Sequence, residues 1–190
     1  MNHTELLNKL IAKHYLKSYL EIGVRTPDAN FNKIICDVKF GVDPNCIGYV
    51  DIFAGKSDEY FKKYNHKWDL IFIDGLHHAD QVKRDFDNSL KCLNDNGFIV
   101  IHDTCPIDES TTIVPRGTQK VWHGDVYKFA MSLANYDGID FYTIDQDCGM
   151  TVVWKDKSKK GEQIQDEFSF KHYQIFKQPL LKIVDEPFEL

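Results

Sequence analysis

Short apolar segments alternate with amphipathic ones along most of this 190-residue chain, and this alternation restricts the fold more than any other feature. Trp68–Asp74 is apolar almost throughout, as expected of a strand that is covered on both faces. Asp80–Leu93 follows with apolar residues at helical spacing, and Phe98–His102 is a second short apolar run. The order strand, helix, strand predicts parallel pairing through a right-handed crossover.

Similar patterns occupy the rest of the chain. The other expected strands are Tyr19–Val24, Lys39–Asp43, Gly48–Phe53, Ile139–Asp145 and Gly149–Lys155, and the other expected helices are Glu5–His14 capped by Thr4, Asp28–Val38, Ser57–Tyr64 capped by Ser57, and Asp125–Asn135. We interpret Asp103–Gly117 as a long loop, and we expect the tail from Glu162 to begin as a helix and become irregular after Pro179. These elements predict an α/β domain over residues 1–155 and an extension, 156–190, that packs on the domain or on a partner chain.

The acidic balance of the chain argues against a polyanionic partner. Its 29 acidic and 23 basic residues give a formal net charge of −6, whereas nucleic-acid binders usually present a basic face. Its five cysteines are scattered, which indicates neither a disulfide framework nor a zinc knuckle. No segment approaches the roughly 18 apolar residues of a membrane helix, and the first residues lack the apolar core of a signal peptide. We therefore expect a cytoplasmic protein that binds neither nucleic acid nor membranes.

Polar residues follow several of the expected strands at the point where each strand ends. They are Gly23, Asp43, Asp74, His102 and Asp103. The carboxyl ends of parallel strands meet at one edge of the sheet, and ligands of such sheets bind there. The sequence therefore predicts one shared cleft lined by these residues.

The first two strand ends fit a nucleoside ligand. Gly23 permits close approach to the backbone, and Asp43, 20 residues later, could accept both hydroxyls of a ribose. A tight turn followed by a solvated aspartate is the alternative interpretation. Ser57 and Asp58 begin a helix and could bind an adenine edge, although for this pair alone a simple helix cap is the better interpretation.

Two neighbouring strands end in carboxylates that should lie close together. Asp74 and Asp103 would raise each other's pKa unless a cation lies between them. With His77, His78 or His102 they could form a mixed oxygen and nitrogen site for Mg²⁺ or another divalent cation. Each histidine alone is better explained as a structural hydrogen-bonding residue, but the convergence of several polar residues at one edge favours a functional site.

In order and spacing, the motifs resemble the class I S-adenosylmethionine-dependent methyltransferases, and most of all the family called methyltransferase domain 24. The resembling segments are Tyr19–Val24, Gly41–Pro44, Ser57–Phe61, Phe72–His77, His102–Thr104 and Trp122–Val126. The resemblance implies a Rossmann-like three-layer sandwich with a seven-stranded, mostly parallel sheet whose last strand is antiparallel. It also implies that residues 1–155 bind S-adenosylmethionine.

The resemblance assigns roles to the strand-end residues. It implies that Glu21 and Gly23 line the methionine part of the cofactor, Asp43 the ribose, Ser57 and Asp58 the adenine, and Asp74 the transferring methyl group. Related sugar and antibiotic O-methyltransferases hold magnesium with acidic residues at the ends of these two strands. Asp74 and Asp103 match those positions, and His102 stands where some relatives have another acid.

We therefore expect a methyltransferase that methylates an oxygen of a small hydroxylated acceptor, such as a sugar or glycoconjugate. Methyl transfer is an in-line displacement, so the protein mainly aligns donor and acceptor. His77 or His78 would take the acceptor proton, and a cation at Asp74 and Asp103 would lower the acceptor pKa. The alternatives are a non-catalytic S-adenosylmethionine or nucleotide-binding module and a metal-dependent hydroxylase or hydrolase that uses Asp74, His77 and Asp103. The aromatic tail leaves a homodimer open.

Overall fold

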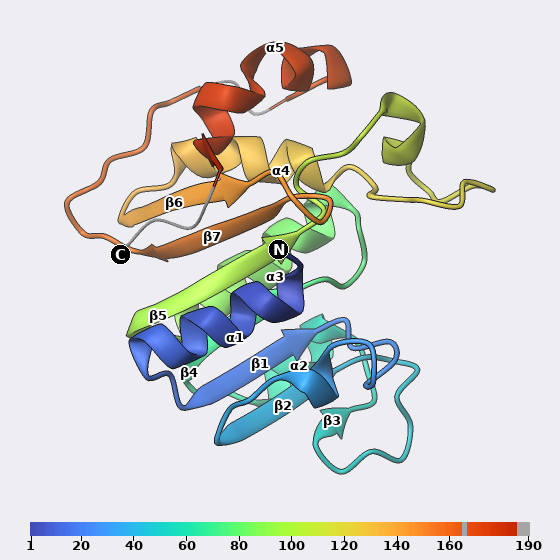
Figure 1. The fold of residues 1–190 in the computed structure, drawn as a ribbon, viewed down its shortest axis with the longest axis vertical. Helices are drawn as coiled ribbons and strands as arrows, with labels where there is room; N and C mark the ends of the chain where they lie inside the picture. Colours follow the sequence, from blue (N-terminus) through green and yellow to red (C-terminus); the bar gives the residue numbers. More distant parts are fainter. Residues whose placement is uncertain (165–166, 186–190) are drawn as a thin grey trace.

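The computed structural model describes residues 1–164 and 167–185, which form one eight-stranded sheet flanked by helices (Figure 1). The strands are β1 (Ser18–Ile22), β2 (Val38–Val42), β3 (Ile52–Phe53), β4 (Trp68–Ile73), β5 (Leu93–His102), β6 (Ile139–Ile144), β7 (Met150–Lys155) and β8 (Ile183–Val184). The helices are α1 (His3–His14), α2 (Ser57–Lys63), α3 (Ala79–Cys92), α4 (Val126–Ser132) and α5 (Phe170–Leu181), with short 3₁₀ turns at Phe31–Lys33, Glu109–Thr112 and Leu133–Asn135.

The order of strands across the sheet is β3-β2-β1-β4-β5-β7-β6-β8. All pairs are parallel except those made by β7, which runs antiparallel to both β5 and β6. The predicted mostly parallel sheet with an antiparallel seventh strand is therefore confirmed. The predicted number of seven strands is one too few, because the two-residue strand β8 adds to the edge beside β6.

The two faces of the sheet are covered by different helices, which confirms the three-layer arrangement. Leu70 and Phe72 of β4 pack in one core cluster with the buried residues of α1, and Ile71 and Ile73 pack in another with those of α3 and α4. Figure 1 shows α1 across one face, with α2 and α3 behind the sheet. Because successive strand residues point to opposite faces, a strand covered on both sides must be apolar throughout.

The helix predicted for Asp28–Val38 does not form, and its place is taken by one 3₁₀ turn and the first residue of β2. The side chain of Asn8, on α1, accepts a hydrogen bond from the backbone nitrogen of Ile35 and donates one to the carbonyl of Lys33. These contacts hold the segment extended, and the β-branched Ile34 and Ile35 have little helix propensity to oppose them.

Two predicted helix caps are also wrong. The carboxamide oxygen of Asn2 accepts the backbone hydrogen bond of Glu5 and so caps α1, whereas the Thr4 hydroxyl donates to Asn30 instead. Ser57 is the first residue of α2, and Lys56 occupies its N-cap position. The third predicted strand is shortened to Ile52–Phe53.

The tail was predicted to begin as a helix and to become irregular after Pro179, but its helix comes later in the structure. Its first described residues are not helical, and α5 begins at Phe170 and includes Pro179 in its last turn. The helix packs on α4, where the rings of Tyr127 and Tyr173 lie 5.2 Å apart. The described part of the extension therefore packs on the domain and completes the sheet edge through β8.

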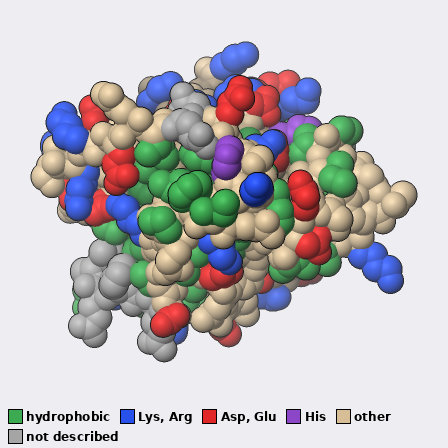
Figure 2. All heavy atoms as spheres, turned by 90° about the horizontal axis from the view of Figure 1, so that it is seen from above, with side chains coloured by type: hydrophobic (Ala, Val, Ile, Leu, Met, Phe, Trp, Pro, Cys, Tyr) green, Lys and Arg blue, Asp and Glu red, His purple; other side chains and the backbone are tan. Residues whose placement is uncertain are grey.

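The outer face of α5 is chemically mixed. Ile175 and Phe176 are exposed on this helix. Figure 2, which looks onto this end of the molecule, shows hydrophobic, basic and acidic side chains interspersed over the surface. Among the described residues, none of the helices is both long enough and apolar enough to cross a membrane.

Candidate active site

The carboxyl ends of β1, β4 and β5 meet at one edge of the sheet, as the sequence predicted. Ile22 lies opposite Ile73, and Ile73 lies opposite Ile101, so the residues that follow these strands become neighbours. Gly23 has a φ angle of +95°, and a Cβ atom there would lie 2.1 Å from the backbone oxygen of Asp74. Only glycine permits this approach.

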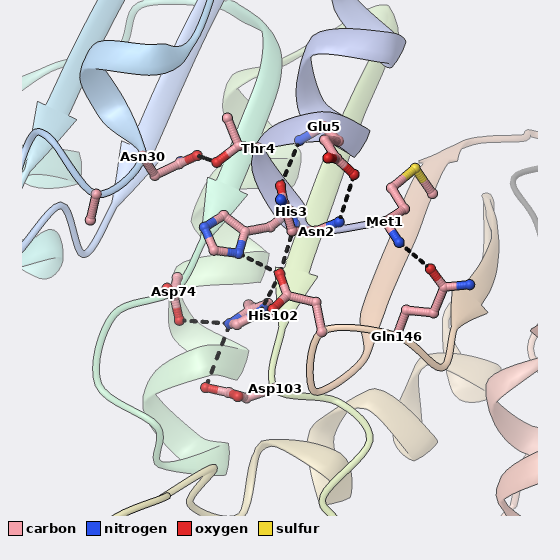
Figure 3. A network of polar contacts seen from close by, with 12 residues as sticks. Met1, Asn2, His3, Thr4, Glu5, Asn30, Asp74, His102, Asp103 and Gln146 are labelled. Carbon is pink, nitrogen blue, oxygen red and sulfur yellow. Dashed lines mark hydrogen bonds and ion pairs between the residues drawn. The ribbon is translucent and has the colours of Figure 1, made fainter.

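Asp74 and Asp103 are bridged by the imidazole rings of His77 and His102. Figure 3 shows the His102 ring between the two carboxylates. The Nε2 atom of His77 lies 3.3 Å from Asp74 Oδ1, and its Nδ1 atom lies 3.0 Å from Asp103 Oδ2. The Nδ1 atom of His102 lies 3.3 Å from Asp74 Oδ1 and 3.7 Å from Asp103 Oδ2. The structure thus brings together four of the residues predicted for catalysis and metal binding.

Within this cluster, the carboxylates favour the charged histidines and the histidines favour the charged form of Asp74. Burial alone would lower the pKa of His102, but the carboxylates of Asp74 and Asp147 raise it well above its usual value. Burial likewise opposes the shift at His77, where the hydrogen bond to Asp74 and the charge of Asp103 raise the pKa. Burial favours neutral Asp74, yet His102 and His77 hold its pKa below the usual range. Burial raises the pKa of Asp103 to about 6.

The His77 ring is held in place by the loop that precedes α4. It stacks on Trp122 with ring centroids 5.1 Å apart, and its Nδ1 atom lies 3.1 Å from the Trp122 carbonyl oxygen. Gly124 approaches the backbone of His77 so closely that a Cβ atom would overlap its carbonyl oxygen. His78 lies in a different position from His77. It occupies the N-cap of α3, and its ring makes a T-shaped contact with Trp122.

Two other residues of this loop have structural contacts. The carboxylate of Asp125 accepts a hydrogen bond from the backbone nitrogen of Ala79 and therefore caps α3, although its backbone begins α4. Tyr127 is buried against Tyr173 and Phe170. Trp122, by contrast, lies beside the cluster, where it stacks on His77.

Glu21 is a buried carboxylate on β1. Its Oε2 atom accepts hydrogen bonds from the Tyr19 hydroxyl at 2.6 Å and from Asn30 at 2.9 Å. Burial raises its pKa to about 7, against the smaller opposing effect of these two hydrogen bonds. A cationic group beside Glu21 would therefore stabilise its ionised form.

Asp43, at the end of β2, organises the loops around it. Its Oδ2 atom accepts a hydrogen bond from the backbone nitrogen of Arg25, and its Oδ1 atom accepts one from Asn45. Each carboxylate oxygen has a second lone pair, so Asp43 can still accept from a ligand. The turn that follows β1 at Gly23 is thus held by the hydrogen bond between Arg25 and Asp43.

Ser57 and Asp58 contact α3. The Ser57 hydroxyl accepts a hydrogen bond from Gln81 at 3.2 Å, and Asp58 lies 3.6 Å from the Arg84 guanidinium. Neither residue contacts the cluster of Asp74 and Asp103. A groove of about 620 Å³ lies between the start of α3, α4 and residues 167–172, and none of the predicted site residues line it.

The donor set around Asp74 and Asp103 suits a divalent cation. Two carboxylates and the Nδ1 atom of His102 can offer one ligand atom each within 4.8 Å of one another. The neighbouring His123 has a buried Nε2 atom without a hydrogen-bond partner in the described structure. Mixed oxygen and nitrogen donors favour Mn²⁺, Fe²⁺, Co²⁺ or Zn²⁺ over Mg²⁺.

The sequence interpretation missed His3, Asp147 and His123, which all border this cluster. Asp147 lies in the turn between β6 and β7, and β6 ends at the same edge as β4 and β5. The predicted hairpin could therefore have located Asp147. The approach of His3 depends on how α1 packs, for which the sequence carries no signal.

Residues 13–104 match the methyltransferase domain family Methyltransf_24. This range contains Glu21, Asp43, Asp74 and Asp103. No curated protein sequence is significantly similar to the chain.

Solved structures with the same fold include a protein described as a caffeoyl-CoA O-methyltransferase from Staphylococcus aureus, at 20% identity and a TM-score of 0.60, covering 80% of this chain and 82% of that one. The O-methyltransferase TomG from Streptomyces achromogenes, in complex with S-adenosylmethionine, is 14% identical with a TM-score of 0.60 over 80% and 79% of the two chains. MycE, from the mycinamycin biosynthetic pathway and in complex with magnesium and S-adenosylhomocysteine, is 15% identical with a TM-score of 0.55 over 91% and 54%. The TM-scores show that this chain shares the fold of these proteins.

Proposed function

We propose that this chain is a class I S-adenosylmethionine-dependent methyltransferase and that it methylates a hydroxyl oxygen of a small acceptor such as a sugar or glycoconjugate. The match of residues 13–104 to a methyltransferase domain family and the fold shared with solved O-methyltransferases support the proposal. The observation that carries the proposal is the position of His77 between Asp74 and Asp103, beside the glycine turn of β1. A proton acceptor there adjoins the place where such folds bind their ligand.

The cofactor would lie across the ends of β1 and β2. Gly23 allows the backbone to approach the methionine part, and Glu21 offers a buried carboxylate for its ammonium group. Asp43 would accept the ribose hydroxyls, and Ser57 with Asp58 would meet the adenine at the start of α2. Asp74 would then lie nearest the transferring methyl group.

His77 is our first choice for the proton acceptor, ahead of His78. Its Nδ1 atom, 3.0 Å from Asp103, would fix the ring and stabilise the charge that the ring acquires, and its Nε2 atom, on the side of Asp74, would accept the acceptor proton. Against the effect of burial, the hydrogen bond to Asp74 and the charge of Asp103 raise the pKa of His77, which favours the protonated ring in the free protein. The positive sulfonium of the donor, arriving beside Asp74, would lower the pKa of His77 and favour the neutral ring.

Asp74, His102 and Asp103 would hold the divalent cation that the fold's relatives suggest. Bound there, the cation would supply positive charge that lowers the pKa of the acceptor hydroxyl. Asp74 and Asp103 also orient the His77 ring through their contacts with its two nitrogens. The acceptor would enter beneath the loop of residues 103–125, from which Trp122 reaches the cluster.

Methyl transfer from labelled S-adenosylmethionine tests the proposal. Purified protein would be incubated with a panel of sugars, glycosides and phenols, and labelled product would be measured by mass spectrometry. We expect a methyl ether on one of the hydroxylated acceptors, and this product should be lost in both Asp74→Ala and His77→Ala. Turnover that survives in both variants would refute the assigned roles. Metal binding without any binding of S-adenosylmethionine would favour a hydroxylase or hydrolase instead.

A further inference from the structure

Three segments that are distant in sequence meet on the far side of the His102 ring. They are the first turn of α1, the end of β5 and the turn between β6 and β7. They bring His3 and Asp147 to the Nε2 atom of His102, whereas its Nδ1 atom faces Asp74 (Figure 3). His3 and Asp147 lie outside residues 13–104, and the proposed methyl transfer uses neither.

The ligand atoms of these three residues are close enough to share one ion. One such atom from each lies within 4.8 Å of the others. The Nε2 atom of His102 is 3.6 Å from Asp147 Oδ2, and the Nδ1 atom of His3 is 2.6 Å from the same oxygen. Ligands about 2.1 Å from a tetrahedral ion are separated by about 3.4 Å. The distance from His102 to Asp147 already fits this value. The distance from His3 to Asp147 would increase when the ion replaces the proton that these two residues share.

His102 supplies an independent sign that a ligand belongs here. Its Nε2 atom is buried and makes no hydrogen bond within the described part of the chain. Buried ring nitrogens nearly always have a partner, so an unbonded one that faces a carboxylate and a second imidazole suits a metal ion.

The rings are also fixed before any ion arrives. His3 stacks on Phe72 with centroids 5.5 Å apart, and it meets His102 edge-on at 4.9 Å. The backbone nitrogen of His3 donates a hydrogen bond to Asp147 Oδ2 at 2.7 Å. The side chains of His3 and Asp147 are 25% and 28% exposed, so an ion can enter from solvent.

We infer that His3, His102 and Asp147 form a second metal site, which shares only the His102 ring with the site proposed at Asp74, His102 and Asp103. Two imidazoles and one carboxylate select a divalent transition metal such as Zn²⁺ or Co²⁺ over Mg²⁺ and Ca²⁺. The ion would attach the start of α1 to the turn between β6 and β7. Because a neutral imidazole offers a single lone pair, an ion on Nε2 leaves the His102 proton on Nδ1, so His102 would serve only one of the two sites at a time.

Cobalt titration of the whole chain tests the inference, because bound Co²⁺ absorbs visible light in proportion to occupancy. The protein should carry no affinity tag, since tag histidines bind the same ions. Wild type should show a saturable band, and His3→Gln and Asp147→Asn should each weaken binding by at least about tenfold. His66→Gln, at an exposed histidine outside the cluster, is the matched control and should bind as wild type does.

Asp74→Asn separates this site from the other one. It removes a carboxylate from the proposed catalytic site and should leave the cobalt band that depends on His3. Zn²⁺ should also raise the melting temperature of Asp74→Asn, in which the other site lacks a carboxylate, but not that of Asp74→Asn combined with His3→Gln. The folding of both variants without metal is checked by circular dichroism. The inference is overturned if wild type binds no Co²⁺, if His3→Gln binds as wild type does, or if Asp74→Asn abolishes the band.

Discussion

The backbone of Gly23 lies so close to that of Asp74 that a single added methyl group would stand 2.1 Å from the Asp74 carbonyl oxygen. This contact joins the end of the first strand to the end of the fourth. The proposed binding site for the methionine part of the cofactor therefore lies directly beside Asp74 and His77, the residues that we propose for catalysis.

Gly23→Ala should therefore damage both stability and cofactor binding. Alanine is strained at a φ angle of +95°, which costs about 1–3 kcal/mol, and its Cβ atom would also displace the end of β4. Gly48→Ala is the matched control, since Gly48 has a φ angle of +91° with nothing within 4 Å of the added atom. Chemical denaturation and S-adenosylhomocysteine titration of both variants provide the measurement. Equal losses in the two would show that the contact with Asp74 has no importance.

Glu21 should make the protein less stable as the pH rises. Its pKa is raised from 4.5 to about 7 in the folded state, so the folded protein binds this proton more tightly than the unfolded chain does. The resulting stabilisation is complete below about pH 4.5 and is lost as the pH rises to about 7, which amounts to roughly 3 kcal/mol at most.

Glu21→Gln should remove that part of the pH dependence. The free energy of unfolding would be measured by urea denaturation at pH 5 and pH 8 for both proteins. Asp85 and Asp103, whose pKa values are raised to about 6, titrate in both, so the difference between the two proteins isolates Glu21. Identical pH slopes would contradict the assignment of a high pKa to Glu21.

His77→Gln should lower kcat by about 10²- to 10⁴-fold, because a glutamine cannot take the acceptor proton. The KM for S-adenosylmethionine should change little. The loss should be smaller for an acceptor with a more acidic hydroxyl, such as a nitrophenol, because that hydroxyl needs less help to ionise. A loss of the same size for every acceptor would indicate a purely structural role for His77.

Removal of divalent cations should reduce turnover. Activity would be measured after treatment with a chelator and again after addition of Mn²⁺ or Mg²⁺. Asp103→Asn should raise the cation concentration needed for half-maximal activity by about tenfold or more, because it removes one of two carboxylates. Full activity in the presence of chelator would exclude a catalytic cation at Asp74 and Asp103.

The edge of the sheet was predictable because it depends on local patterns. The continuous apolar stretch of β4 and the alternation of strands and helices determine which strand ends are adjacent, and these ends carry Asp74 and Asp103. Gly23 and Asp43 follow from the same argument. His77 was predicted as a candidate, but its position relative to His78 depends on the close contact with Gly124.

The errors lie where tertiary contacts outweigh local preference. Residues 28–38 have a plausible helical spacing, yet Asn8 of α1 holds their backbone extended. Pro179 suggested a helix end, but α5 contains it in the last turn, where little helix remains to be disrupted. His3 reaches the cluster only because α1 packs across the sheet, and no short-range pattern encodes that contact.

Calorimetric titration with S-adenosylhomocysteine tests the central claim most directly. The account predicts saturable binding at one site per chain, weakened at least about tenfold by Asp43→Ala, which removes the carboxylate proposed for the ribose hydroxyls. Absence of binding to wild type, with and without added Mg²⁺ or Mn²⁺, would contradict the proposed function as a whole.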